Sequence, residues 1–182
     1  LYPVEAKGGG VISCAMYIEP FYTVRNTNVD LMLECCFLSH RYGVDILSSM
    51  RIIRWLMELY EKGVITAKDT DGIPMEWGSR EAIIGMLKKI AHREGFGDVL
   101  ADGILPAAER IGRGARDYAH QVKGLPIFSL VSNRDWLKQL KGAALTTVVS
   151  SRGDDIKGLA YAELAGPHFH ENYDEEQMAA LR

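Results

Sequence analysis

Hydrophobic positions in the first two thirds of the chain recur every three or four residues, which is the spacing of an amphipathic helix. The first such stripe lies between Asn28 and Gly43, and its members are Val29, Met32, Leu33, Cys36 and Phe37. Asn28 can serve as the N-cap of a helix, and Gly43 can end it in the left-handed conformation. This stretch therefore predicts a helix over about residues 28–42.

A second stripe predicts a helix from about Ile46 to Lys62, closed by Gly63. Its expected buried positions are Ile53, Leu56, Met57 and Tyr60. Glu58 and Lys62 stand four residues apart on the opposite face and are expected to form an ion pair. Turn-forming residues then fill a connector over residues 63–78.

A third stripe begins after Ser79, which we expect to cap the helix. Its apolar positions are Ala82, Ile83, Met86, Leu87 and Ile90. Asp98 is expected to cap a fourth helix over about residues 99–111. Because Pro106 lacks a backbone donor and crowds the preceding turn, we expect this helix to break or kink near Ile104.

Beyond Gly112 the periodic signal weakens. Short helices are expected over residues 115–122, 136–141 and 174–181, whereas residues 145–149 fit either a β-strand or a buried helix. The chain has no internal repeat and no low-complexity segment. Since helical segments follow one another along most of the chain, the predicted fold class is mostly α, a multi-helix domain rather than an alternating βαβ protein.

Composition narrows the class of protein. Of the 182 residues, 47% are hydrophobic and 25% charged, with a formal net charge of −3 and an isoelectric point near 6.0. This apolar content argues against disorder, and the absence of a basic stripe argues against a nucleic-acid-coating protein. No apolar run approaches the roughly 20 residues that cross a bilayer. Three cysteines fit a reducing compartment, and the start at Leu1 is expected of a piece of a longer protein.

The metal-ligand types are scattered along the chain. Cys35 and Cys36 would point about 100° apart on a helix, which favours buried thiols over shared metal ligands. The segment 168–171 contains two histidines and a glutamate, with Asp174 close by, and is the best metal-like cluster. A role in a loop or an interface is nevertheless the favoured interpretation, because the two histidines lie close to the chain end and lack a third firm ligand. His92 and His120 are expected to be partly exposed helix residues.

Two further segments have anion-binding character. The glycine run at residues 8–10 is a turn signal and only a weak phosphate-loop signal, because no helix start or Lys-Ser/Thr pair follows it. The Ser-Ser-Arg-Gly segment at residues 150–153 can present backbone donors and a guanidinium to an anion. The overlapping Arg-Gly-Asp tripeptide at 152–154 fits chance recurrence. No Ser-His-Asp arrangement, Walker loop or paired-carboxylate site is evident in the sequence.

Several short motifs also occur in a fixed order along residues 20–126. They are Arg41-Tyr42-Gly43-Val44-Asp45, Met57 to Gly63, Asp69 to Gly72, Trp77-Gly78, Ile90 to Asp98, Leu100 to Gly103, Ala107-Ala108 and Val122 to Leu125. Their order and gaps resemble the helical second domain of the aldehyde ferredoxin oxidoreductase family of tungsten enzymes. More weakly, Ser151-Arg152-Gly153 is similar to the Asn-Arg-Gly segment that starts the family's third domain.

The resemblance implies that residues 1–126 correspond to family domain 2, and residues 127–182 to a linker and the start of domain 3. In such enzymes a tungsten (or molybdenum) bis-pterin centre lies between these helical domains and an N-terminal domain, near a [4Fe–4S] cluster. The family's CxxCxxxC cluster motif is absent from this sequence, and Cys14 would be a displaced remnant of that region. We therefore expect both cofactors in the intact protein and neither in the isolated chain.

The resemblance also implies cofactor-binding residues. The family's pterin motif, Asp-x-x-Gly-Leu-Asp/Cys, matches residues 40–45, with His40 in place of the first aspartate. Gly43, Val44 and Asp45 are therefore the candidates, with Asp45 accepting hydrogen bonds from a pterin ring.

A second segment, residues 155–160, fits the letters of the same motif, but it follows the Arg-Gly segment closely and has Ala160 where a cluster cysteine would stand. Coincidence is the favoured interpretation of its candidates, Asp155, Gly158 and Leu159.

The family's catalytic positions are altered in this sequence. The Pro-Glu-Tyr-Glu-Thr segment of the family aligns with residues 19–23, which puts Tyr22 in place of the active-site glutamate and makes it the candidate catalytic residue. The active-site histidine falls near Gly142 and Ala143, where the sequence has none. A tyrosine can donate a proton but is not the same base at neutral pH.

The function implied by the resemblance is oxidation of aldehydes to carboxylic acids with ferredoxin as electron acceptor, or, in a related branch, reduction of aromatic acyl-CoA rings. One alternative is a non-catalytic helical scaffold or binding module descended from such enzymes. Another is a metal-binding regulatory domain centred on His168 and His170. Expected partners are the remaining domains, ferredoxin or another electron carrier and a small-molecule substrate, in the cytoplasm. A homo-oligomer is allowed, and neither nucleic acid nor a membrane span is expected.

Overall fold

The computed structural model describes residues 19–127 and residue 149. Residues 19–127 lie in one compact unit, and residue 149 lies in another, with the division between Ser129 and Leu130. The assignment of these parts to family domains stays a prediction. In residues 19–127 the elements are α1 (Glu19–Thr23), α2 (Val29–Tyr42), α3 (Ile46–Glu61), α4 (Arg80–His92), α5 (Phe96–Ala101), α6 (Ile104–Ile111), the 3₁₀-helix η2 (Ala115–Tyr118), β1 (Gln121–Val122) and β2 (Leu125–Pro126).

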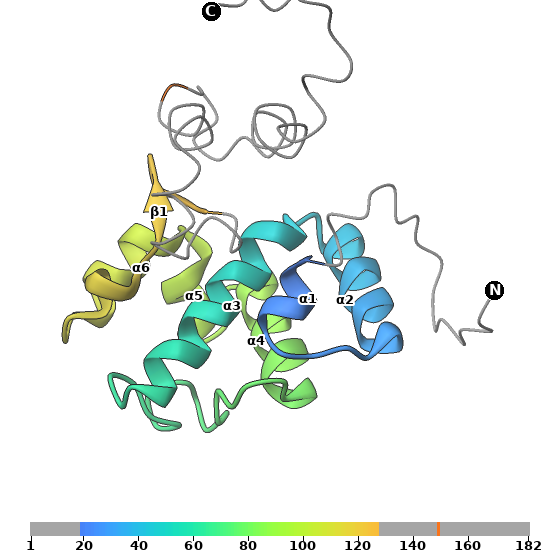
Figure 1. Ribbon diagram of the computed structural model, residues 1–182, viewed down its shortest axis with the longest axis horizontal. Coiled ribbons are helices and arrows are strands. Elements are labelled where there is room, and N and C mark those ends of the chain that lie inside the picture. The colour runs from blue at the N-terminus through green and yellow to red at the C-terminus, as the bar shows by residue number, and fades with distance from the viewer. Residues whose placement is uncertain (1–18, 128–148, 150–182) are drawn as a thin grey trace, which may run out of the picture. The chain divides into compact units, whose positions relative to one another are not determined.

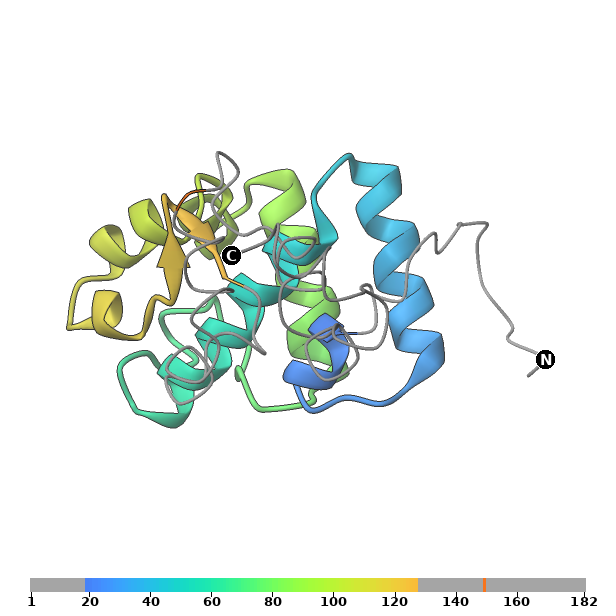
Figure 2. The same ribbon diagram turned by 45° about the horizontal axis from the view of Figure 1, so that its top comes forward.

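Helix α3 is the central element of residues 19–127. It contacts α1, α2, α4, η2 and β2 (Figure 1). Turning the molecule by 45° leaves α2 on one side of α3 and α4, and places α6 with the hairpin on the other (Figure 2). The core is built mainly from α3 and α4, whose buried apolar side chains include Met50, Ile53, Leu56, Leu59, Ile83, Met86 and Leu87. The mostly α fold class is therefore confirmed.

The helix ends follow local chemistry. Asn28 accepts a hydrogen bond from Leu31 N at 2.9 Å, and Ser79 caps α4 by accepting from Ala82 N at 3.2 Å. Both caps were expected from side-chain oxygens that precede a helix. The expected break also occurs, since α5 ends at Ala101 and α6 begins at Ile104. Pro106 lies in the first turn of α6, where the missing backbone donor costs little.

Three details of the sequence-based prediction are wrong. The cap of α5 is Gly95 rather than Asp98, which lies inside the helix. On α2 the buried side chains are Leu31, Cys35, Cys36 and Ser39, so the predicted stripe is rotated by about one residue. Apolar residues surround most of that helix, so periodicity alone did not select the buried face. Glu58 pairs with Arg54 at 3.5 Å instead of Lys62.

The helix predicted over residues 115–122 is also wrong. One 3₁₀ turn is followed by an antiparallel hairpin in which Val122 pairs with Leu125. Lys123 and Gly124 both have positive φ, 54° and 85°. Such a two-residue loop suits the twist of a hairpin and cannot continue a helix. His120 therefore lies outside any helix, whereas the exposed His92 ends α4, as expected.

The other predicted helices, at 136–141 and 174–181, lie outside the described residues. In the 145–149 stretch, Val149 alone is described, and it is helical and 68% exposed.

Candidate functional site

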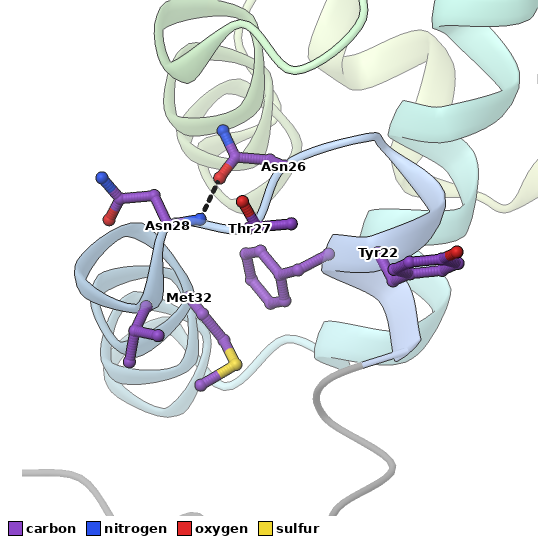
Figure 3. A pocket seen from close by; sticks show the side chains of 7 residues that line it. Tyr22, Asn26, Thr27, Asn28 and Met32 are labelled. Carbon is purple, nitrogen blue, oxygen red and sulfur yellow. Dashed lines mark hydrogen bonds between the residues drawn. The ribbon is translucent and has the colours of Figure 1, made fainter.

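A pocket opens between α1, the loop at residues 24–28 and the first turn of α2 (Figure 3). Its cavity has a volume of about 180 Å³ and is lined by Phe21, Tyr22, Asn26, Thr27, Asn28, Val29 and Met32. Phe21 is buried and Met32 half-buried, while Val29 is 52% exposed at the mouth. No lining residue carries a formal charge, so the pocket is suited to uncharged apolar groups.

The loop at residues 24–28 is held at several points. The Asn26 side chain accepts a hydrogen bond from Asn28 N and donates one to Gly78 O, each at 2.8 Å. The Arg25 guanidinium stacks 4.4 Å from the centre of the Trp77 ring. These contacts join the loop to the connector that precedes α4, so the pocket wall is preformed in the described part of the chain.

Tyr22, the candidate catalytic residue, lies on α1 and is 71% exposed. It lines the pocket, but its ring is directed away from Asn28 and Met32 (Figure 3). The tyrosine hydroxyl therefore stands at the outer edge of the pocket rather than inside it. Its catalytic role stays a prediction.

The candidate pterin motif forms the corner between α2 and α3. Gly43 has φ 68°, and its N–H donates to His40 O while Val44 N donates to Ser39 O at 3.0 Å. This pair of bonds is a Schellman motif, which requires a left-handed residue at the position of Gly43. The space beside the Gly43 Cα is open, because an added Cβ would meet no atom within 4 Å.

Asp45 begins the next helix. Its Oδ2 accepts a hydrogen bond from Ser48 N at 2.9 Å, which makes it the N-cap of α3. The residue is exposed, and its other carboxylate oxygen has no partner among the described residues. Asp45 can therefore cap the helix and accept another hydrogen bond at the same time.

The structure does not bring the two sets of candidate residues into one site. The pocket lies at the N-terminal end of α2, whereas Gly43, Val44 and Asp45 follow its C-terminal end. The 14 residues of α2 span about 21 Å at 1.5 Å per residue. Within residues 19–127, Tyr22 and the corner thus belong to separate surfaces. Asp155, Gly158 and Leu159 lie outside the described residues.

The two described cysteines are buried in the core, as expected, and burial raises the pKa of both thiols. Both thiols are therefore protonated at neutral pH and pack as apolar side chains. In the described part of the chain, no three His, Cys, Asp or Glu residues cluster as a metal site would require. Cys14, the glycine run 8–10, the segment 150–154 and the histidine cluster around 168–171 lie outside that part.

Sequence reasoning missed the pocket and the contacts that hold it. Asn26 and Gly78 are 52 residues apart, and so are Arg25 and Trp77. No short motif encodes such pairs. The available signal was Asn26 itself, two residues before the N-cap, because asparagine often hydrogen-bonds nearby backbone groups in turns.

Comparison with known proteins identifies the family. The family model "Aldehyde ferredoxin oxidoreductase, domains 2 & 3" matches residues 22–181. The chain belongs to the aldehyde ferredoxin oxidoreductase family. A tungsten-containing aldehyde ferredoxin oxidoreductase of Pyrococcus furiosus is 39% identical over 82 residues, 44% of this chain and 14% of the relative. The WOR-like subunit of an aliphatic sulfonate oxidoreductase from the same organism is 31% identical over 125 residues, 65% of this chain and 19% of that subunit.

One solved structure is also similar to this chain. The active-site complex BamBC of benzoyl coenzyme A reductase, in complex with 1,5-dienoyl-CoA, matches with a TM-score of 0.61 and 31% identity. The match covers 69% of this chain and 19% of that chain. The family member described here thus spans less than a fifth of the length of these relatives. In its described residues, no helix is long and apolar enough to cross a membrane.

Proposed function

We propose that this chain is part of a tungstopterin (or molybdopterin) iron–sulfur oxidoreductase that oxidises aldehydes to carboxylic acids and passes electrons to ferredoxin. In that reaction an aldehyde and water give a carboxylic acid, two protons and two electrons, and two ferredoxins take one electron each. The observation that carries the proposal is the family match over residues 22–181. The tungsten named in the relatives supports the choice of metal.

The corner between α2 and α3 fits the role of a pterin contact. An exposed carboxylate oxygen of Asp45 can accept a hydrogen bond from a pterin N–H, and the open space beside Gly43 allows a flat ring to approach the backbone. The bound tungsten–pterin group would supply the two-electron redox chemistry. The [4Fe–4S] ligands would come from other parts of the intact protein, since the family's CxxCxxxC motif is absent from this sequence.

One further activity and one non-catalytic role are the alternatives for this chain. Reduction of an aromatic acyl-CoA ring is supported by the similarity to the benzoyl coenzyme A reductase complex. A non-catalytic scaffold is favoured by Tyr22, which stands in place of the family glutamate and directs its ring away from Asn28 and Met32. Under each of these hypotheses, we expect this chain to contact the remaining domains of its parent protein.

The experiment is elemental analysis of the full-length protein from cells supplied with tungstate and molybdate. The oxidoreductase proposal expects tungsten or molybdenum together with iron and acid-labile sulfide. A purified full-length protein that contains neither metal nor cluster would contradict it and support the scaffold.

A further inference from the structure

The pocket beside α1 has the size of a small ring. Its volume of about 180 Å³ is comparable to that of an engineered cavity of about 150 Å³ that binds benzene. Phe21 and Met32 supply apolar walls, and the flexible thioether of Met32 can adjust to the shape of a guest.

The polar side chains of the pocket differ in how much of their hydrogen-bonding capacity is already used within the protein. Asn26 uses both ends of its amide within the protein. The exposed Thr27 hydroxyl has no partner among the described residues, and it can hydrogen-bond to a ligand. The absence of charge on every lining residue disfavours a carboxylate or sulfonate, because a desolvated anion needs a cation or several donors.

The wall that carries Thr27 is already in place. Arg25 N and Asn26 N donate to Tyr22 O and Phe21 O, each at 3.0 Å, which ties the loop back onto α1. The Asn26–Gly78 bond and the Arg25–Trp77 stacking hold it from the other side. A ligand would therefore order little of the protein on binding, which favours affinity.

We propose that this pocket binds the apolar group of an uncharged small molecule, a benzene-sized ring or a branched aliphatic group of similar volume, with the Thr27 hydroxyl bonded to its neutral head. Binding itself requires no cofactor.

The test uses the 182-residue chain with ¹³C-labelled methionine methyl groups, and a Met32→Leu variant assigns the Met32 signal. Benzyl alcohol and benzoate are the probes, because they share a ring and differ in charge. We expect a saturable shift of the Met32 methyl signal at millimolar benzyl alcohol, and at least tenfold weaker binding of benzoate.

Two matched variants locate the site. Val29→Glu puts a carboxylate at the mouth of the pocket. The fold should tolerate it, because an acidic side chain is favourable in the first turn of a helix. This variant is expected to weaken benzyl alcohol binding about tenfold. Leu125→Glu, at another exposed apolar residue, is expected to leave binding unchanged. Thr27→Val keeps the shape and is expected to weaken benzyl alcohol about threefold to tenfold while leaving toluene unaffected.

The proposal is overturned if the Met32 signal does not respond to benzyl alcohol, if benzoate binds equally well, or if Val29→Glu and Leu125→Glu behave alike. Each of these results is independent of metal content, because the chain is tested without cofactor. If the pocket binds no ligand, the oxidoreductase proposal is unaffected, because elemental analysis of the full-length protein tests it separately. If the full-length protein contains no metal, the proposal of ligand binding in the pocket is likewise unaffected.

Discussion

The side-chain amide of Asn26 joins Asn28 N to Gly78 O, with both hydrogen bonds at 2.8 Å. One side chain thus connects the loop before α2 with the connector before α4, across 52 residues of sequence. Asn26 and Asn28 also line the apolar pocket, so the shape of the pocket depends on this polar contact.

Asn26→Ala is expected to lower the free energy of unfolding by about 1–2 kcal/mol, because two hydrogen bonds of a half-buried group are lost together. Urea denaturation followed by circular dichroism measures the change. Thr27→Ala, at the exposed neighbouring residue, serves as the control and should stay within about 0.5 kcal/mol of the unmodified chain. Equal effects of the two substitutions would show that the Asn26 bridge does not stabilise the fold.

Two substitutions of Asp45 distinguish its role as a helix cap from a role in binding the pterin. Asp45→Asn keeps an oxygen that can cap α3, whereas Asp45→Ala removes it and should cost about 1 kcal/mol of stability. In the full-length protein, Asp45→Asn is expected to lower the pterin content measured by oxidation to fluorescent pterin derivatives. If pterin content is unchanged while Asp45→Ala destabilises the chain, Asp45 is a helix cap and no more.

The carboxylate of Asp69 makes the free energy of unfolding depend on pH in the acidic range. Its carboxylate accepts a hydrogen bond from Arg113 at 2.9 Å and another from Thr66 N at 2.7 Å, and these bonds lower its pKa from 3.8 to about 2. A carboxyl group whose pKa is lower in the folded state stabilises the fold above its unfolded pKa, and this contribution is lost as the pH falls from about 4 to 2. The group is near the surface, so the loss is modest.

The measurement is the urea midpoint between pH 5 and pH 2. Asp69→Asn is expected to show a smaller decrease over this range than the unmodified chain. Arg113→Gln, which removes the first cause of the low pKa, should flatten the decrease in the same direction. An unmodified chain and an Asp69→Asn variant with parallel pH curves would rule out this carboxylate as a source of acid sensitivity.

Gly97 lies where α5 meets α4 at close range. A Cβ at this position would stand 2.2 Å from the carbonyl carbon and oxygen of Lys89, which belong to the backbone and cannot move aside alone. Gly97→Ala is therefore expected to lower the free energy of unfolding by about 3 kcal/mol.

Gly85→Ala is the matched control on α4. There the added Cβ would lie 3.1 Å from Cδ1 of Ile73, the end of a side chain that can shift, and alanine favours the helix by about 1 kcal/mol. The control should change stability by no more than about 1 kcal/mol. Similar losses in both variants would mean that helix packing at Gly97 is looser than the backbone distances indicate.

Much of the helical framework was predictable because its signals are local. Asn28, Ser79 and Gly43 act within a turn of their own position, and each was identified correctly from its residue type and place. The prediction of the buried face of α4 was also correct, since charged residues lie on both sides of its apolar stripe. The hairpin at 121–126 was missed because its turn, Lys123-Gly124, lacks the usual asparagine or aspartate signal.

The candidate site was less predictable for two reasons. The pocket depends on Asn26–Gly78 and Arg25–Trp77, and neither contact leaves a trace in local sequence. The motif around Gly43 was visible, but its residues also shape a helix corner. A match to such a motif is equally compatible with a bound ligand and with a purely structural requirement, so the cofactor role of Asp45 rests on family membership.

The stacking of Arg25 on Trp77 has an optical consequence. An indole beneath a guanidinium emits differently from one beside water, and the loop that carries Arg25 also forms the wall of the pocket. Movement of that wall would therefore change the emission of an intrinsic fluorophore that lies on a different segment of the chain.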